Sequence, residues 1–536
     1  MHYFNYPPGG TSTLVTRDSK MSGRHGKPLR GEMSTAHSSL SQGRFGRMFR
    51  SLPAAKYGKN DDESKANLKL LGAKMTSDFD APKDSTDDEE SGIPALYTYF
   101  GQFIDHDLTF DPMSTLIKHT DPDALTDFRT PAFDLDNIYG RGKDDQPYMY
   151  DDGPTFLLGD AIDGASDPNA HDLPRNNANP RRALIGDPRN DENTIVSQLQ
   201  GLFLRFHNRT VKDHPEIDAN SDFTQIQKLV RFHYQYVILT DFLPRIINSG
   251  VLAELKDDEG HFSKEKLKFF HWKDEPFMPV EFSVAAYRLG HSMIRPGYRL
   301  NDNDFTLLPI FPVPSQGLNE GLTGFRALLP HWAIDWGRFV DIDIRPRGDG
   351  NPANPDSKKR LQFAYRLDTS LVDPLSMLPP SVASDPPPSL PQRNLIRSFI
   401  LGLPCGQAVA RAMKIVPLND DEITIGKAVD NPGPGDVLGT IASIPELSVF
   451  KGNCPLWTYI LAEAIRNQAN VKIPVKEDTT VTTPQLGPVG GRIVAEVFLG
   501  LMFGDPDSML SLDPKWQPPS GPIFGLKDLV KYALGN

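Results

Sequence analysis

The sequence predicts a mainly α-helical fold, and two observations support this prediction. Apolar residues recur at spacings of three and four in several long segments, as in helices that bury one face. The alternation of apolar and polar residues that is typical of strands is scarce. The 536 residues, 38% of them hydrophobic, could form two or three average domains or one large core. We expect one large multi-helix domain with little β structure and no internal repeat.

Composition excludes several classes of protein. The net charge of -12 disfavours nucleic acid and anionic membranes as main partners. No run of 18 apolar residues is present, so we expect no membrane span. No conventional signal peptide is visible, which makes the cytoplasm the default compartment and leaves open export by a signal of another kind. The two cysteines do not make a disulfide scaffold, and the oligomeric state is not readable.

The chain divides into an N-terminal arm and a main domain. Residues 1–90 are polar and predict a mostly irregular arm on the surface, and residues 91–536 form the main domain. A proline-rich loop is expected at 378–391. Helices are expected at 93–110, from Gly186 to about Val211, and at 223–248, 281–294, about 393–400, 455–466 and 487–503.

The first of these helices carries a cluster of polar side chains. At 100° per residue, Gln102, Asp105 and His106 share one face, and Asp107 points away from it. Most other residues of this helix are aromatic or aliphatic, which predicts burial. The same polar residue types also occur on solvated helix faces. Buried ionisable groups on an apolar helix are functional-site candidates.

Three further clusters lie on other predicted helices or at their ends. Arg189 and Glu192 are spaced as in an exposed ion pair, which contributes roughly 0.3–0.5 kcal/mol. Arg288 precedes His291 by three residues, and a single helical histidine is usually structural. Asn394 begins a later helix. Each cluster has an ordinary explanation when taken alone.

Together these motifs resemble the animal-type haem peroxidases of the peroxidase–cyclooxygenase superfamily. The resemblance covers about residues 93 to 500 and implies that 91–536 is a haem peroxidase catalytic domain. The matching motifs are Gly101-Gln102-x-x-Asp105-His106-Asp107, Asp187-x-Arg189-x-x-Glu192, Leu204-Arg205-x-His207-Asn208-Arg209, Arg288-x-Gly290-His291, a loop that ends at Tyr139-Gly140, and Asn394.

The resemblance implies a haem b between two histidines. His291 would be the axial ligand of the haem iron, and Asn394 would accept a hydrogen bond from its other ring nitrogen. On the opposite face His106 would move a proton between the oxygens of hydrogen peroxide, and Arg189 would stabilise the developing negative charge. Gln102 would hold water or a halide, and Arg288 would place positive charge near the haem edge.

The resemblance also implies covalent attachment of the haem. Asp105 and Glu192 align with two carboxylates that form ester bonds to haem methyl groups in mammalian members. Asn193 stands where one mammalian member has the methionine of a third, sulfonium link, so we expect two esters at most. His207, Asn208 and Arg209 are assigned to packing and hydrogen bonding.

A calcium site is implied next to the distal helix. A set of carboxylates and neutral oxygens suits a hard cation with six to eight oxygen ligands, although an acidic, solvated turn is the ordinary alternative. By resemblance the ligands would be Asp107, Thr130 (hydroxyl and carbonyl), Ala132 (carbonyl), Asp134 and Asp136.

The implied activity is reduction of hydrogen peroxide and oxidation of small donors through a ferryl intermediate. The donors would be phenols, aromatic amines, or halide and thiocyanate. One alternative is a fatty-acid dioxygenase, whose radical-forming tyrosine lies three residues before the proximal histidine. Arg288 occupies that position here, and Tyr287 is one step away, about 100° around a helix, which favours a peroxidase. A non-catalytic calcium- or haem-binding adhesion module is the other alternative, disfavoured by the intact set of His106, Arg189 and His291.

Overall fold

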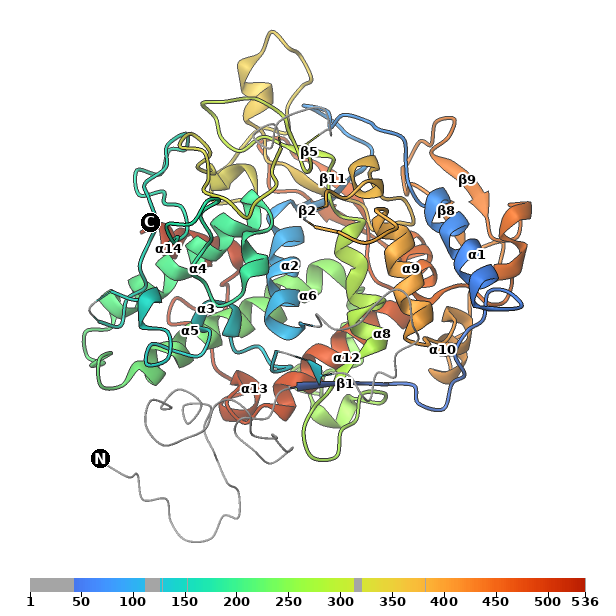
Figure 1. The fold of residues 1–536 in the computed structure, drawn as a ribbon, viewed down its shortest axis with the longest axis horizontal. Coiled ribbons are helices and arrows are strands. Elements are labelled where there is room, and N and C mark those ends of the chain that lie inside the picture. Colours follow the sequence, from blue (N-terminus) through green and yellow to red (C-terminus); the bar gives the residue numbers. More distant parts are fainter. Residues whose placement is uncertain are drawn as a thin grey trace.

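Helices dominate the computed structural model (Figure 1), which describes residues 43–110, 126–127, 129–151, 153–312, 321–380 and 382–535. The prediction of a mainly α-helical fold is confirmed. The helices are α1 (Asp61–Lys74), α2 (Leu96–Leu108), α3 (Asp136–Tyr139), α4 (Thr194–Asp213), α5 (Phe223–Val237), α6 (Leu243–Ile246), α7 (Ser249–Ala253), α8 (Val280–Ser283), α9 (Leu390–Ile400), α10 (Gly406–Ala412), α11 (Leu456–Arg466), α12 (Pro488–Gly504), α13 (Met509–Leu512) and α14 (Leu526–Leu534).

The strands are short and pair mostly in twos. Their pairs are β3-β1-β4, β2-β7, β5-β6, β8-β9 and β10-β11. Their bounds are β1 (Gly43–Gly46), β2 (Glu90–Pro94), β3 (Thr126–Asp127), β4 (Met278–Pro279), β5 (Gly297–Tyr298), β6 (Leu308–Pro309), β7 (Phe363–Tyr365), β8 (Thr424–Gly426), β9 (Val437–Thr440), β10 (Gln468–Lys472) and β11 (Thr480–Pro484). Within the described ranges no sheet exceeds three strands. The sheets are therefore small connections between helices and do not form a continuous layer.

The helix α2 lies in the middle of the molecule (Figure 1). It packs against α4 and follows β2 directly, which pairs with β7. Ten of its 13 residues are buried, as its aromatic composition predicts. Pro94, expected in the first helical turn, instead ends β2, because the preceding residues pair with a strand.

The N-terminal stretch is less irregular than predicted. Residues 61–74 form α1, where we expected irregular structure. The side chain of Asn60 accepts a hydrogen bond from the backbone of Glu63, and this cap starts the helix. Leu68 and Leu71 are fully buried, and α1 packs along α9. Tertiary packing stabilises this helix, which its polar sequence does not predict. Residues 1–42 lie outside the described part of the chain.

The predicted helix over 281–294 is also corrected. The segment forms two short pieces, α8 and a 3-10 helix, Ala286–His291, separated at Val284 and Ala285. Ala285 has an extended φ of -132° that interrupts the helix. Apolar spacing over so few residues does not distinguish an α-helix from a 3-10 helix, which has three residues per turn.

Candidate active site

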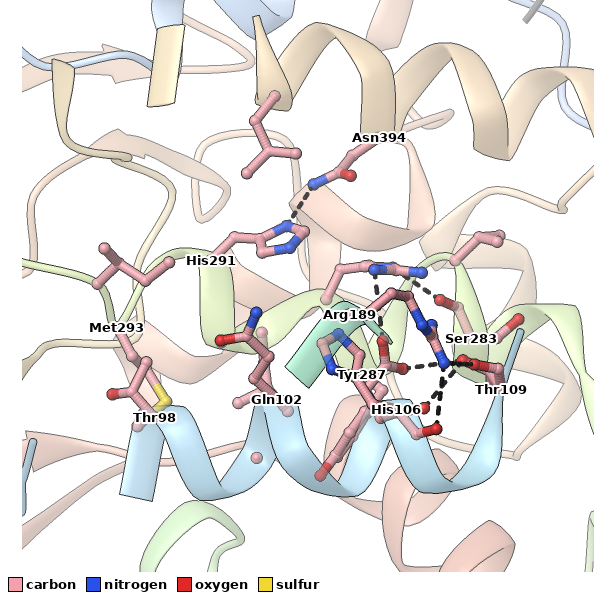
Figure 2. A pocket seen from close by; sticks show the side chains of 18 of the residues that line it. Thr98, Gln102, His106, Thr109, Arg189, Ser283, Tyr287, His291, Met293 and Asn394 are labelled. Atoms are coloured by element: carbon pink, nitrogen blue, oxygen red, sulfur yellow. Dashed lines mark hydrogen bonds and ion pairs between the residues drawn. The ribbon is translucent and has the colours of Figure 1, made fainter. Parts of the chain in front are cut away.

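A cavity of about 470 Å³ lies between α2, α9 and the 3-10 helix Ala286–His291. Its volume is in the range of about 300–1,000 Å³ that is usual for small-molecule and cofactor sites. All the predicted haem-side residues line it: Gln102, Asp105, His106, Arg189, Glu192, Arg288, His291 and Asn394. Figure 2 shows His291 on one side of this space and Gln102 and His106, on α2, on the other.

The two histidines are electrically neutral at physiological pH; His106 is buried and His291 is half-buried. Burial, and then the nearby Arg189, lower the pKa of His106 from 6.5 to about 4. Burial, and then Arg288, lower the pKa of His291 to about 3. Neutral imidazoles are the form that ligates a metal or accepts a proton. Both rings therefore have an unprotonated nitrogen available at pH 5–8.

The distal wall, the α2 side of the cavity, is built around Arg189. Its guanidinium donates to the carbonyls of His106 and Thr109, at 3.1 and 2.6 Å, and forms an ion pair with Asp187 at 2.7 Å. It also lies over the Phe110 ring, 4.6 Å from the centroid. These contacts fix the guanidinium at the end of α2 while part of it still faces the cavity.

Asp187 is fully buried between two arginines. Burial alone raises a carboxyl pKa, but Arg189 and Arg129 outweigh it and hold the pKa of Asp187 well below its usual range. The side chain of Asp187 also accepts from the backbone N–H of Arg189. Asp187, two residues before Arg189, therefore holds the arginine side chain in position.

Glu192 and Gln102 meet across the distal wall. The Gln102 amide donates to the Glu192 carboxylate, and this carboxylate lies 3.8 Å from Nε2 of His106. Burial raises the pKa of Glu192 from 4.5 to about 7, although Arg189 opposes the shift. Because the NH₂ group of Gln102 donates to Glu192, its carbonyl oxygen points away from Glu192.

The proximal wall, the side of His291, is simpler. The Asn394 amide on α9 lies 2.8 Å from Nδ1 of His291, and Figure 2 shows this pair above the cavity. Arg288 donates from Nε to the Ser283 carbonyl and approaches Asp105 at 3.7 Å. Asn394 and His291 are in contact, but through the amide nitrogen Nδ2 of Asn394, whereas the resemblance implies that Asn394 accepts the hydrogen bond.

Tyr287 belongs to the cavity, which the sequence reasoning missed. It stands four residues before His291 in the 3-10 helix Ala286–His291. Tyr287 lines the cavity, and its hydroxyl is buried with no hydrogen-bond partner. Its ring stacks on Phe282 at 4.8 Å. Tyr287 therefore adds a phenol to the residues of the proximal side.

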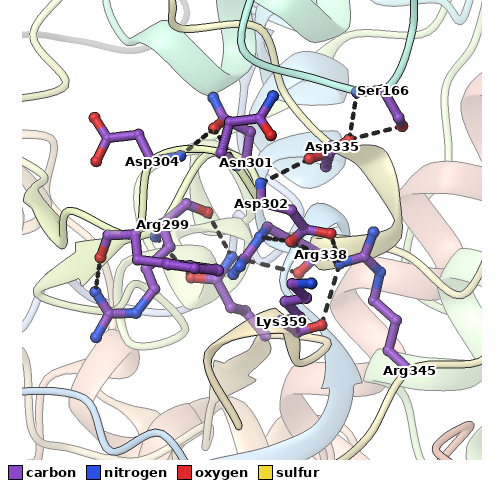
Figure 3. A network of polar contacts seen from close by, with 12 residues as sticks. Ser166, Arg299, Asn301, Asp302, Asp304, Asp335, Arg338, Arg345 and Lys359 are labelled. Carbon is purple, nitrogen blue, oxygen red and sulfur yellow. Dashed lines mark hydrogen bonds and ion pairs between the residues drawn. The ribbon is translucent and has the colours of Figure 1, made fainter. Parts of the chain in front are cut away.

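A buried ion network supports the start of α2 (Figure 3). Arg338 donates to Asp302 at 2.7 Å, and Arg345 binds the same carboxylate. The residue after Arg338, Phe339, accepts from the backbone N–H of Leu96 at 2.9 Å. The network thereby fixes the position where the distal helix begins.

The acidic residues of the predicted calcium loop converge beside α2. Asp107 is fully buried, its Oδ2 accepts from the Tyr234 hydroxyl at 3.2 Å, and its Oδ1 has no hydrogen-bond partner. Burial, and then the charges of Asp134 and Asp136, raise the pKa of Asp107 well above its usual value. The Thr130 hydroxyl lies 3.5 Å from the Asp136 carboxylate. No compact group of three or more His, Cys, Asp or Glu side chains suited to a metal is found among the described residues.

Comparison with known proteins identifies a similar family. Residues 118–312, less than half of the chain, match the family model of the animal haem peroxidases. Over this range the chain is similar to that family. The matched range includes Arg189, Glu192, Arg288 and His291, whereas α2 lies before it and Asn394 after it. Members of this family are haem-binding oxidoreductases.

The similar proteins are distant, and the curated ones are much longer than this chain. Human thyroid peroxidase is 28% identical over 167 residues, which cover 30% of this chain and 16% of that protein. Dual oxidase of Drosophila melanogaster is 30% identical over 126 residues, 23% of this chain and 7% of that protein. Peroxidase A of Dictyostelium discoideum aligns over 89% of both chains with 14% identity and a TM-score of 0.49. This chain thus matches only a small part of the two curated relatives.

One further prediction concerns the membrane. Across the described ranges, every helix is too short or too polar to cross a bilayer.

Proposed function

We propose that this chain is a haem-dependent peroxidase that reduces hydrogen peroxide and oxidises small donors. One observation carries the proposal: two neutral histidines on facing walls of one cavity each have Nδ1 hydrogen-bonded to an asparagine. This leaves both Nε2 atoms free for chemistry. The proposed catalytic domain is 91–536.

The residues present fit a haem. His291 would ligate the iron through Nε2, and rotation of the Asn394 amide about its last bond presents Oδ1 to an Nδ1–H of His291. Arg288 lines the cavity and offers positive charge at the haem edge. When bound, the haem supplies the redox chemistry, taking oxidising equivalents from peroxide and passing them to phenols, aromatic amines, halide or thiocyanate.

The distal residues move the proton. Nε2 of His106 accepts the proton from one peroxide oxygen and returns it to the other, which leaves as water. Asp187 orients the Arg189 guanidinium. The guanidinium stabilises negative charge on the departing oxygen. The carbonyl oxygen of Gln102 would accept a hydrogen bond from a water on the distal side.

Two carboxylates line the cavity in positions that could hold the haem covalently. Asp105 and Glu192 come from different elements, α2 and the residue before α4. We propose ester bonds from both to haem methyl groups. Acid–acetone extraction tests this, because ester-linked haem stays with the protein and non-covalent haem leaves it.

A calcium ion at the loop after α2 is part of the proposal. The unpartnered Oδ1 of buried Asp107 and the neighbouring Asp134 and Asp136 give the negative charge that a divalent cation would balance. Thr130 and the Ala132 carbonyl would complete the ligands. The cation would tie α2 to the following loop and so hold His106 in place.

Replacement of His106 tests the function. His106→Ala should lower peroxide turnover about 10²–10⁴-fold, the usual contribution of a general acid–base, while the Soret band of bound haem persists. His171→Ala, outside the cavity, is the matched control and should keep full turnover. Unchanged oxidation of phenolic donors by the His106 variant would disprove the mechanism.

Fatty-acid dioxygenation is a second candidate, favoured by Tyr287. Tyr287 lines the cavity and its buried hydroxyl has no hydrogen-bond partner, although the residue stands four positions before His291 and not three. Tyr287→Phe separates the two activities. A dioxygenase would lose fatty-acid-dependent oxygen uptake in this variant, whereas a peroxidase would keep its turnover with phenolic donors.

A further inference from the structure

Two buried side-chain amides, those of Asn190 and Gln200, connect the distal histidine to a backbone carbonyl. Nδ1 of His106 lies 2.6 Å from Oδ1 of Asn190. Nδ2 of Asn190 donates to Oε1 of Gln200 at 2.7 Å, and Nε2 of Gln200 donates to the backbone carbonyl of Asn137 at 3.1 Å. Asn190, Gln200 and Asn137 are all fully buried. The chain of contacts joins α2, the 3-10 segment Pro188–Asp191, α4 and α3.

The last contact fixes the direction of every bond in the chain. A backbone carbonyl can only accept, so Gln200 must present its NH₂ group to Asn137. Gln200 then presents its oxygen to Asn190, which must donate with its own NH₂ group. Asn190 is left with its oxygen toward His106, and Nδ1 of the neutral imidazole must carry the hydrogen.

We infer that Asn190 is the positioning residue that selects the Nδ1–H tautomer of His106, with Gln200 locking the orientation of its amide. The selected tautomer places the unprotonated Nε2 toward the cavity, where the proposed reaction needs a base. With the other tautomer, Nε2 would carry a hydrogen and could not accept the proton from peroxide. The inference therefore rests on the proposed function for its chemical consequence, but not for the tautomer itself.

Isotope-labelled histidine in the haem-free protein reads the tautomer directly. The nitrogen-15 shifts of His106, assigned by their loss in His106→Gln, should show a protonated Nδ1 in the wild type. Asn190→Ala should give a mixture of both tautomers, and Asn190→Asp, which keeps an acceptor oxygen, should restore the protonated Nδ1. A wild-type protein with hydrogen on Nε2 would overturn the inference.

Kinetics of the haem-loaded protein test the consequence. Asn190→Ala should slow the bimolecular reaction with hydrogen peroxide at least tenfold, with little change in the dependence on donor concentration. Asn190→Asp should recover most of the rate. Gln200→Met, which frees the Asn190 amide to rotate, should give an intermediate loss.

The matched control is Asn208→Ala. Asn208 likewise accepts from and donates to backbone groups, those of Phe156 at 2.7 and 2.9 Å, but does not line the cavity. It should keep the wild-type rate. Equal losses in the Asn190 and Asn208 variants, or no loss in either, would overturn the inference. A wild type that binds no haem or ignores peroxide would refute the proposed function while leaving the tautomer experiment valid.

Discussion

The two walls of the cavity hold their histidines in different ways. His106 ends a chain of two side-chain amides whose bond directions are fixed by a backbone carbonyl. His291 has one amide partner, Asn394, which can present either its oxygen or its nitrogen. A metal at Nε2 of His291 would itself force the hydrogen onto Nδ1. The distal ring has no such ligand, so the protein must choose its tautomer.

The same difference extends to charge. The distal wall carries Arg189, held by the buried Asp187 and by two carbonyls of α2. On the proximal wall, Arg288 pairs only loosely, at 3.7 Å, with Asp105. Fixed dipoles and charges stabilise a transition state without reorganising. The firmly held Arg189 is therefore expected on the distal side, where negative charge develops. The less firmly paired Arg288 suffices on the proximal side, where a cofactor would be held.

After the loss of His106 itself, the largest expected effect concerns that fixed cation. Arg189→Leu should lower the rate with peroxide about 10²–10³-fold, the usual loss when one stabilising donor is removed from an active site. The haem should remain bound. Stopped-flow kinetics with peroxide measure the loss.

Arg129→Leu is the matched control for this arginine. Arg129 pairs with the same Asp187 at 2.6 Å but does not line the cavity. Its loss should change the rate much less. An equal loss in both variants would mean that Arg189 acts only by supporting the fold.

The proximal wall has a smaller expected effect. Asn394→Leu removes the hydrogen-bond partner of His291 and should weaken haem binding about 10–100-fold, as is usual when the partner of a metal ligand is lost. Asn394→Asp keeps an acceptor and should retain most of the affinity. Titration of haem into the haem-free variants measures this. Unchanged affinity in Asn394→Leu would remove the proximal half of the comparison.

The pH dependence of stability separates the two rings. Because folding lowers both histidine pKa values, the unfolded chain takes up protons first as the pH falls. Stability from these groups is complete above pH 6.5 and is lost down to about pH 4 for His106 and about pH 3 for His291. One such group changes the slope of the unfolding free energy by at most about 1.4 kcal/mol per pH unit.

Urea unfolding of the haem-free protein between pH 3 and 7 measures that slope. His106→Gln should flatten it mainly between pH 6.5 and 4, and His291→Gln should extend the flattening towards pH 3. A wild-type slope in both variants would show that neither ring is held neutral by burial.

The sequence predicted which residues line the cavity but not the hydrogen bonds that hold their side chains. Gln102, Asp105 and His106 converge because helical periodicity determines a face, and the apolar remainder of α2 buries it. Asn190 stands between Arg189 and Glu192 with no periodic or compositional signal, since its role depends on contacts with α2 and α4. That Tyr287 lines the cavity was not predicted, because its position four residues before His291 does not show where its ring packs.

Of the long helices, α11 and α12 were predicted within a few residues, whereas α4 begins at Thr194, eight residues after the predicted start at Gly186. Helices α11 and α12 are buried on almost all sides, and their apolar sequences show this. The helix α1 was missed, because its polar sequence contributes only a few buried leucines and a capping asparagine. Contacts between distant segments decide such cases, and a single sequence does not display them.

The smallest expected effect is at the loop beside α2. If calcium balances Asp107, Asp134 and Asp136, chelation should lower the melting temperature by a few degrees and slow peroxide turnover by loosening His106. Asp107→Asn should lose this response to chelator while keeping its contact with Tyr234. Since Asp107 follows His106 directly, a chelator-sensitive melting temperature with unchanged turnover would mean that the amide chain alone holds the distal histidine.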